Sequence, residues 1–194
     1  MSSIRNALLS LLAREPLSGY DIKKHMNNRL GPFWKAGSNQ VYPELAKMET
    51  EGLVRLQGIE QHGFRPTKKL YEITEAGQEE VIQWTMEPGE VEHTRDDFLL
   101  KTYNSWLIDP EQMKGQIEIV KQQHEEKLAA YLEKVKELTD MLDPSNTHDP
   151  IASSISVVEF GIEYERLYIT WCDKLMNKSS SLKQVKEQKE GYSS

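Results

Sequence analysis

Side chains able to recognise a nucleic acid gather between positions 38 and 47. Hydroxyl, amide and ammonium groups share one side of an expected helix there: Ser38, Asn39, Gln40, Tyr42 and Lys47. Such groups bind phosphates, and Asn and Gln can make paired hydrogen bonds to adenine. Apolar residues recur at helical spacing on the other side: Val41, Leu45 and Met48. The segment predicts a helix with one face for a core and one for a polar groove, although a plain solvated face has the same composition.

Further basic and polar residues lie on both sides of this segment. Arg65, Lys68 and Lys69 fall at or near the tip of an expected hairpin. That tip is either a solvated loop that protects an edge strand or a wing that lies on a phosphate backbone. Three more positions could contact phosphates: Tyr20 and Lys23 at the start of the second expected helix, and Lys35 just before the third.

The flanking elements place these groups. A helix from Ile4 ends before Pro16, and Ser18-Gly-Tyr-Asp21 has the capping pattern of a second helix. The third helix is expected from Ser38 to Gly52, with Pro43 confined to its first turns. Two β-prone runs, 53–56 and 69–74, predict a hairpin, and Thr74 caps a fourth helix. Residues 1–90 therefore predict a winged helix-turn-helix domain.

The second half predicts a helical domain over residues 91–178. A helix is expected over 95–107, and Asp109-Pro110 begins another of about thirty residues with one narrow apolar seam. A last helix, about 151–177, carries two apolar stripes, which need more than one partner helix. We therefore expect an antiparallel, coiled-coil-like dimerisation domain in a mainly α protein. The Ser-, Lys- and Glu-rich residues 179–194 predict disorder.

Composition limits the possible functions. The 194-residue chain has a net charge of −7, divided into +4 over residues 1–74 and −11 over residues 75–194. A mildly basic head on an acidic body can still bind DNA. The single cysteine, and the lack of an apolar run near the roughly 18 residues that span a bilayer, predict a cytoplasmic protein. No enzyme motif, metal-binding spacing or cofactor motif occurs, so neither catalysis nor a cofactor is expected.

Several motifs together resemble the PadR family of bacterial transcriptional regulators. They are L-S-G-Y-D-I (17–22), S-x-x-x-V-Y-P-E-L-x-x-M-E-x-E-G-L-V (38–54), K-x-Y-E-I-T-E-A-G (69–77) and R-D-D-F-L-L-K (95–101). The resemblance covers nearly the whole chain and implies the longer subfamily, with a helical dimerisation domain. It implies DNA contacts at Tyr42, at 38–40 and at Lys69. The chain departs from the family pattern in a longer wing tip, 57–67.

The resemblance also implies release from DNA by a small aromatic or planar apolar compound. Residues that could line such a pocket at the domain junction are Trp34, Trp84, Tyr103, Trp106, His124, Tyr168 and Trp171. Aromatic residues also dominate cores and interfaces, so the alternative for each of these is packing in a core or at the dimer interface. His124 stands out as the polar group on the apolar seam.

These observations predict a homodimeric winged-helix regulator, a repressor that binds a pseudo-palindromic double-stranded DNA operator without contact to membranes. The alternative is an adaptor that uses the same winged helix and coiled coil to bind proteins and not DNA.

Overall fold

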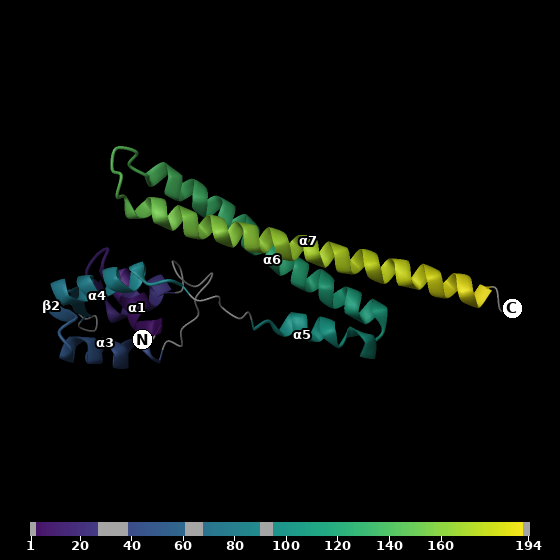
Figure 1. The fold of residues 1–194 in the computed structure, drawn as a ribbon, viewed down its shortest axis with the longest axis horizontal. Helices are drawn as coiled ribbons and strands as arrows, with labels where there is room; N and C mark the ends of the chain where they lie inside the picture. Colours follow the sequence, from purple (N-terminus) through teal and green to yellow (C-terminus); the bar gives the residue numbers. More distant parts are fainter. Residues whose placement is uncertain (1–2, 27–38, 61–67, 90–94, 192–194) are drawn as a thin grey trace. The chain divides into compact units, whose positions relative to one another are not determined.

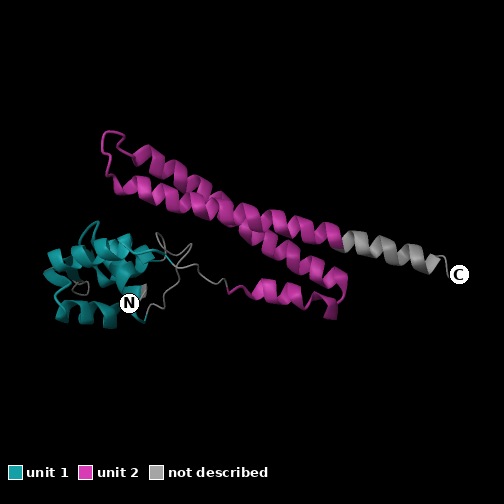
Figure 2. Cartoon of the chain, in the orientation of Figure 1, with its two compact units in different colours: residues 1–91 teal, residues 92–194 magenta. Residues whose placement is uncertain are grey.

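The computed structural model describes residues 3–26, 39–60, 68–89 and 95–191. Side chains are described within these ranges except at 3, 59, 60, 68 and 179–191. The chain divides into two compact units, Met1–Val91 and Glu92–Ser194 (Figure 2). Each unit has its own apolar core, and each core is formed only by residues of that unit.

Unit 1 combines helices with a small antiparallel sheet. Its elements are α1 (Ser3–Leu12), β1 (Leu17–Ser18), α2 (Gly19–His25), α3 (Val41–Thr50), β2 (Val54–Glu60), β3 (Lys68–Ile73) and α4 (Glu75–Met86) (Figure 1). The strand order is β1-β3-β2, with an irregularity in register between Leu56 and Gly58. The sequence predicted the hairpin but not the two-residue strand β1, which pairs with β3 at Leu17 and Tyr71.

The apolar face of each helix in unit 1 forms the core. Fully buried side chains come from α1, α2, α3 and β2: Leu8, Leu9, Ile22, Val41, Leu45, Met48 and Val54. Burial of one such side chain contributes roughly 1.5–3 kcal/mol, so this cluster sets how α3 sits on α1 and α2.

The ends of α2 and α3 follow local sequence signals. Ser18 Oγ accepts a hydrogen bond from the Asp21 amide at 3.2 Å, which confirms the predicted cap. Gly52 has a φ of 77°, the left-handed conformation that favours glycine after a helix. The helix α3 begins at Val41 and not near Ser38 as predicted. Pro43 is then its third residue, where a helix has no internal acceptor for the missing N–H.

Thr74 connects α4 to Gly52, which follows the end of α3. Its Oγ1 accepts from the Gly77 amide at 3.2 Å and donates to the Gly52 carbonyl at 2.6 Å. We expect Thr74→Ala to lower the free energy of unfolding by about 1–2 kcal/mol, because both bonds are lost. Denaturant unfolding measures this, and Thr74→Ser, which keeps the hydroxyl, should lose much less. Equal losses in the two variants would contradict the role of the hydroxyl.

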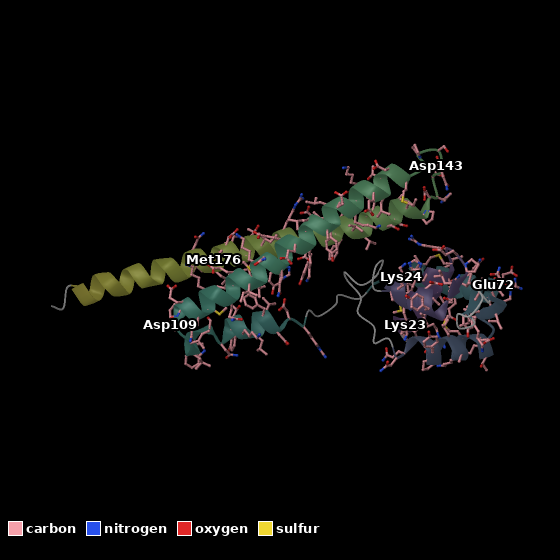
Figure 3. All side chains as sticks on the ribbon, turned by 180° about the vertical axis from the view of Figure 1, so that it is seen from behind. Lys23, Lys24, Glu72, Asp109, Asp143 and Met176 are labelled. Carbon is pink, nitrogen blue, oxygen red and sulfur yellow. The ribbon has the colours of Figure 1, made fainter. Side chains whose placement is uncertain are left out.

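Unit 2 is a long helical hairpin with a short helix before it. Its elements are α5 (Asp97–Tyr103), the 3-10 helix η2 (Ser105–Leu107), α6 (Pro110–Met141) and α7 (Pro150–Gly191). The helices α6 and α7 run side by side in opposite directions (Figure 1). Asp109 and Asp143 flank the two ends of α6 (Figure 3), and Asp109 caps it by accepting from the Glu111 amide at 2.8 Å.

Two helices of unit 2 differ in length from the prediction. The expected helix over 95–107 is divided into α5 and η2. Asp96 caps the start of α5 by accepting from the amides of Phe98 and Leu99, and at Asn104 the α-helix gives way to a tighter 3-10 turn. The helix α7 continues to Gly191, where the composition predicted disorder from 179. Lys, Gln and Glu dominate residues 183–190, and these residues favour a helix once it has started.

The core of unit 2 lies where α5, α6 and α7 meet. Its buried residues are Phe98, Met113, Ile117, Tyr168 and Cys172. Among the described residues, no helix combines the length and the apolar character that crossing a bilayer requires.

Candidate nucleic-acid interface

The two-faced character predicted for α3 is present in its burial pattern. Val41, Leu45 and Met48 are each at most 1% exposed. On the opposite side Tyr42 is 51% exposed, and Lys47 is exposed as well. Asn39 and Gln40 are exposed and lie just before the helix, with Gln40 in the N-cap position. Because their side-chain amides are exposed at the N-terminal end of α3, they are free to enter a groove of DNA.

Tyr42 is held in place by two residues of α2. The ring packs against Gly19, where an added Cβ would lie 2.4 Å from Tyr42 Cε1. Lys23 Nζ stands 4.8 Å from the centre of the same ring, in a cation–π contact. Lys23 and its neighbour Lys24 are labelled on α2 in Figure 3. Because glycine has no Cβ, the Tyr42 ring can lie directly against α2, and this contact fixes the direction of its exposed hydroxyl.

Arg5 of α1 is a residue that sequence analysis did not single out. Its Nε donates to Glu44 Oε1 at 2.9 Å, and its Nη2 lies 2.6 Å from Glu51 Oε2. Its Nη1 lies 3.7 Å from Glu80 Oε1 on α4. The hydrogen bond to Glu44 raises the pKa of Arg5, against the opposing effect of burial. Arg5 therefore links α1 to α3 and α4 through ion pairs.

The structure describes some of the other residues that were predicted to contact DNA. Tyr20 is 64% exposed on α2, and Lys69 is exposed on β3, where it pairs with Ile59 of β2. Lys68 lies opposite Glu60 in the same ladder, with no described side chain. Three predicted positions lie outside the described residues: Lys35, Ser38 and Arg65.

A buried polar cluster lies in unit 2, around the predicted His124. The His124 Nδ1 atom is hydrogen-bonded to Glu165 Oε2, and both residues are buried. The His124 ring stacks on Tyr168 with centroids 3.7 Å apart. Tyr168 donates its hydroxyl to Asp96 Oδ2 at 2.8 Å, and burial together with this bond raises the pKa of Tyr168. Asp96 Oδ1 in turn accepts from the Phe98 amide, so the cluster reaches the start of α5.

Within unit 2, the predicted ligand residues differ in their packing and exposure. Trp171 packs edge-on against Tyr168 at 5.3 Å, next to His124. Tyr103 and Trp106, by contrast, are 80% and 77% exposed. Trp84 belongs to unit 1, and Trp34 lies outside the described residues. Residue type did not distinguish these cases: of the three aromatic side chains on α5 and η2, Phe98 is buried, whereas Tyr103 and Trp106 are exposed.

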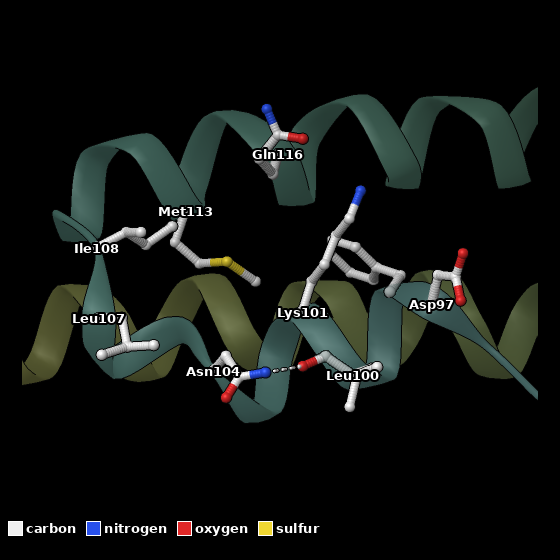
Figure 4. Close-up of a pocket in the computed structure, with 9 residues that line it drawn as sticks. Asp97, Leu100, Lys101, Asn104, Leu107, Ile108, Met113 and Gln116 are labelled. Atoms are coloured by element: carbon white, nitrogen blue, oxygen red, sulfur yellow. Dashed lines mark hydrogen bonds between the residues drawn. The ribbon is translucent and has the colours of Figure 1, made fainter.

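A pocket of about 520 Å³ lies between α5, η2 and α6 in unit 2 (Figure 4). It is lined by Asp97, Phe98, Leu100, Lys101, Asn104, Leu107, Ile108, Met113 and Gln116. None of the predicted ligand residues that the structure describes is among these. No group of three His, Cys, Asp or Glu side chains that could hold a metal is found in the part of the chain that the structure describes.

Comparison with known proteins identifies the family. Residues 8–83 match the model of the transcriptional regulator PadR-like family, and residues 94–179 match the model named virulence activator alpha C-term. The chain belongs to the PadR family. This confirms the predicted family and the prediction of a transcriptional regulator and not an enzyme.

Known PadR-family proteins match along almost their whole length. The negative transcriptional regulator PadR of Bacillus subtilis is 28% identical over 177 residues, which is 91% of this chain and 97% of that protein. A probable transcriptional regulator of Mycobacterium tuberculosis is 26% identical over 183 residues, 89% of this chain and 95% of that protein.

Solved structures give the same fold. The Bacillus subtilis PadR complex with operator DNA has a TM-score of 0.80 at 26% identity and covers 92% of this chain and 98% of that one. The complex of the same protein with p-coumaric acid has a TM-score of 0.74 at 25% identity, over 91% and 98% of the chains. The Vibrio cholerae virulence activator AphA shares the fold, at 23% identity and a TM-score of 0.68 over 93% and 99%. The predicted winged helix with a helical C-terminal part is confirmed.

Proposed function

We propose that this PadR-family regulator is a cytoplasmic, dimeric repressor that binds a pseudo-palindromic operator through α3 and is released by a small ligand. The observation that carries the proposal is the exposed polar face of α3, with Tyr42 held between Gly19 and Lys23. A docked helix needs side chains of fixed direction, because base readout depends on geometry.

The roles of the residues follow from their positions. Asn39 and Gln40 precede the first turn of α3, the part of a recognition helix that reaches base edges. The Tyr42 hydroxyl reaches a phosphate or sugar. Lys47 and Lys69 contact phosphates, and the net charge of +4 over residues 1–74 favours the approach of DNA.

Dimerisation is supported by apolar side chains that unit 2 leaves on its surface. Large exposed side chains occur on α5, η2 and α7: Leu99, Leu100, Tyr103, Trp106, Leu107, Phe160 and Leu167. Apolar surface of this extent is typical of a protein interface. A two-fold dimer would bring two α3 helices to successive major grooves, about one helical turn apart.

A ligand is proposed because Bacillus subtilis PadR has been solved with p-coumaric acid. We expect a small aromatic or planar apolar compound here too. It would act by binding the DNA-incompetent arrangement of the dimer more tightly, since a ligand with equal affinity for both states shifts nothing.

The test is a gel-shift series with the upstream region of the protein's own gene at several salt concentrations. We expect Tyr42→Ala to weaken binding about tenfold, and Lys69→Ala to reduce the slope of log K against log salt by about 1. Lys134→Ala on α6 is the matched control, since Lys134 is exposed and pairs with Glu137 in unit 2. Unchanged affinity in both test variants would refute these residue roles.

The alternative function, a protein-binding adaptor, predicts a different result. The wild-type protein would then show no salt-dependent binding to its own upstream region, and none to any duplex selected from genomic DNA.

A further inference from the structure

Arg5 lies against both ends of the recognition helix. Glu44 is in the first turn of α3, and Glu51 directly follows its last residue, Thr50. The two glutamates are seven positions apart, about 10 Å along a helix axis. One guanidinium group, 2.9 Å from the first carboxylate and 2.6 Å from the second, therefore bridges two side chains that come from the first turn and from the C-cap of α3.

The Arg5 guanidinium balances a cluster of negative charges. Its side chain is 14% exposed and faces three carboxylates, those of Glu44, Glu51 and Glu80. Glu80 Oε1 is buried and accepts no hydrogen bond from the described residues, so Arg5 at 3.7 Å is the cation that balances it. Without Arg5, Glu44 and Glu80 would lose the cation that lies against them, and Glu51 would keep only Lys47, whose Nζ is 3.9 Å from Glu51 Oε1.

Arginine is better suited than lysine to contact three carboxylates at once. Its planar guanidinium has donors on three nitrogens, and each nitrogen here points to a different carboxylate. A lysine ammonium is a single point charge and could hold only one or two of the three. Repulsion among the remaining carboxylates would act on α3 at both ends and move it relative to α1 and α4.

We propose that Arg5 is a positioning residue for DNA recognition, which sets the orientation of α3 by holding Glu44 and Glu51 while it touches no DNA itself. The proposal rests on the proposed function, because it assigns the direction of α3 to a contact behind the DNA-binding face. A correctly directed α3 matters for base readout, whereas phosphate attraction tolerates a displaced helix. Loss of Arg5 therefore acts on specificity more than on general affinity for DNA.

The experiment compares two duplexes. One is selected by the wild-type protein from a random-sequence library, and the other is a scrambled duplex of the same length and composition. We expect Arg5→Met to lose about tenfold or more of its affinity for the selected duplex and at most about threefold for the scrambled one. Arg5→Lys should fall between Arg5→Met and the wild-type protein in the ratio of the two affinities.

Charge compensation supplies the decisive variant. In Arg5→Met/Glu44→Gln/Glu51→Gln the two carboxylates are neutral, so the repulsion caused by the loss of Arg5 is removed. We expect the ratio of the two affinities to return to within about threefold of the wild-type ratio. The ratio is compared, and not the affinity alone, because this variant is less negative than Arg5→Met and attracts any DNA more strongly.

Several results would overturn the proposal. Circular dichroism first shows which variants are folded, and if Arg5→Met is not, Arg5→Lys and the triple variant carry the comparison. A folded triple variant that stays nonspecific overturns the positioning role, and so do equal losses on both duplexes in Arg5→Lys. If the wild-type protein selects no duplex, the proposed function fails and the role of Arg5 fails with it.

Discussion

Replacing Gly19 with alanine is expected to weaken operator binding by up to about tenfold, the loss expected for Tyr42→Ala, while unit 1 stays folded. The new Cβ would lie 2.4 Å from Tyr42 Cε1, closer than side-chain carbons approach one another, and a tight 3.1 Å from Cδ1. Half of Tyr42 is exposed, so the ring can swing outward at little cost to the core. Alanine also favours a helix more than glycine does. The fold therefore persists, and the direction of the phenol is lost.

The measurement is the Kd for the operator at one salt concentration, with a thermal melt of each variant. Gly115→Ala on α6 is the matched control, because nothing lies within 4 Å of an added Cβ at that position. The double variant Gly19→Ala/Tyr42→Ala should bind no more weakly than Tyr42→Ala alone, since both changes remove the same interaction. Additive losses would mean that Gly19 acts on DNA binding by some route other than Tyr42.

The faces of α3 could be predicted from the sequence because they depend on spacing alone. Val41, Leu45 and Met48 fall on one side of any helix through this segment, whatever surrounds it. The role of Gly19 could not be predicted in the same way. Its position in S-G-Y-D indicated a helix start, but the close approach of Tyr42 depends on how α2 crosses α3, which is a matter of tertiary packing.

Partners far apart in the sequence escaped prediction for a related reason. His124 was visible as the polar residue on an apolar seam, whereas Glu165, 41 positions later, looked like one of many acidic residues on a helix. Which residue of α7 faces His124 depends on the register of the α6–α7 hairpin. The aromatic residues of the predicted pocket show the same limit, since composition gave their types but not the exposure of Tyr103 and Trp106.

Replacing His124 with leucine is expected to lower the free energy of unfolding of unit 2 by about 3–5 kcal/mol. Glu165 is 3% exposed and is hydrogen-bonded to His124 Nδ1, so the variant leaves a buried carboxylate without that partner. Denaturant unfolding at neutral pH measures the loss. Glu163→Gln is the control on the same helix, because Glu163 is exposed and pairs with Arg166 one turn away. It should change stability by at most about 1 kcal/mol.

The double variant His124→Leu/Glu165→Leu separates the buried charge from the packing around it. Two apolar side chains in place of a buried pair often cost little, so the double variant should be more stable than His124→Leu alone. The effect should also extend to α5, because Tyr168 stacks on His124 and donates to Asp96, the residue that caps that helix. In His124→Leu the amides of Phe98 and Leu99 should therefore exchange hydrogen faster. Unchanged protection there would mean that the cap on α5 holds independently of the histidine, and that the cluster stabilises α6 and α7 alone.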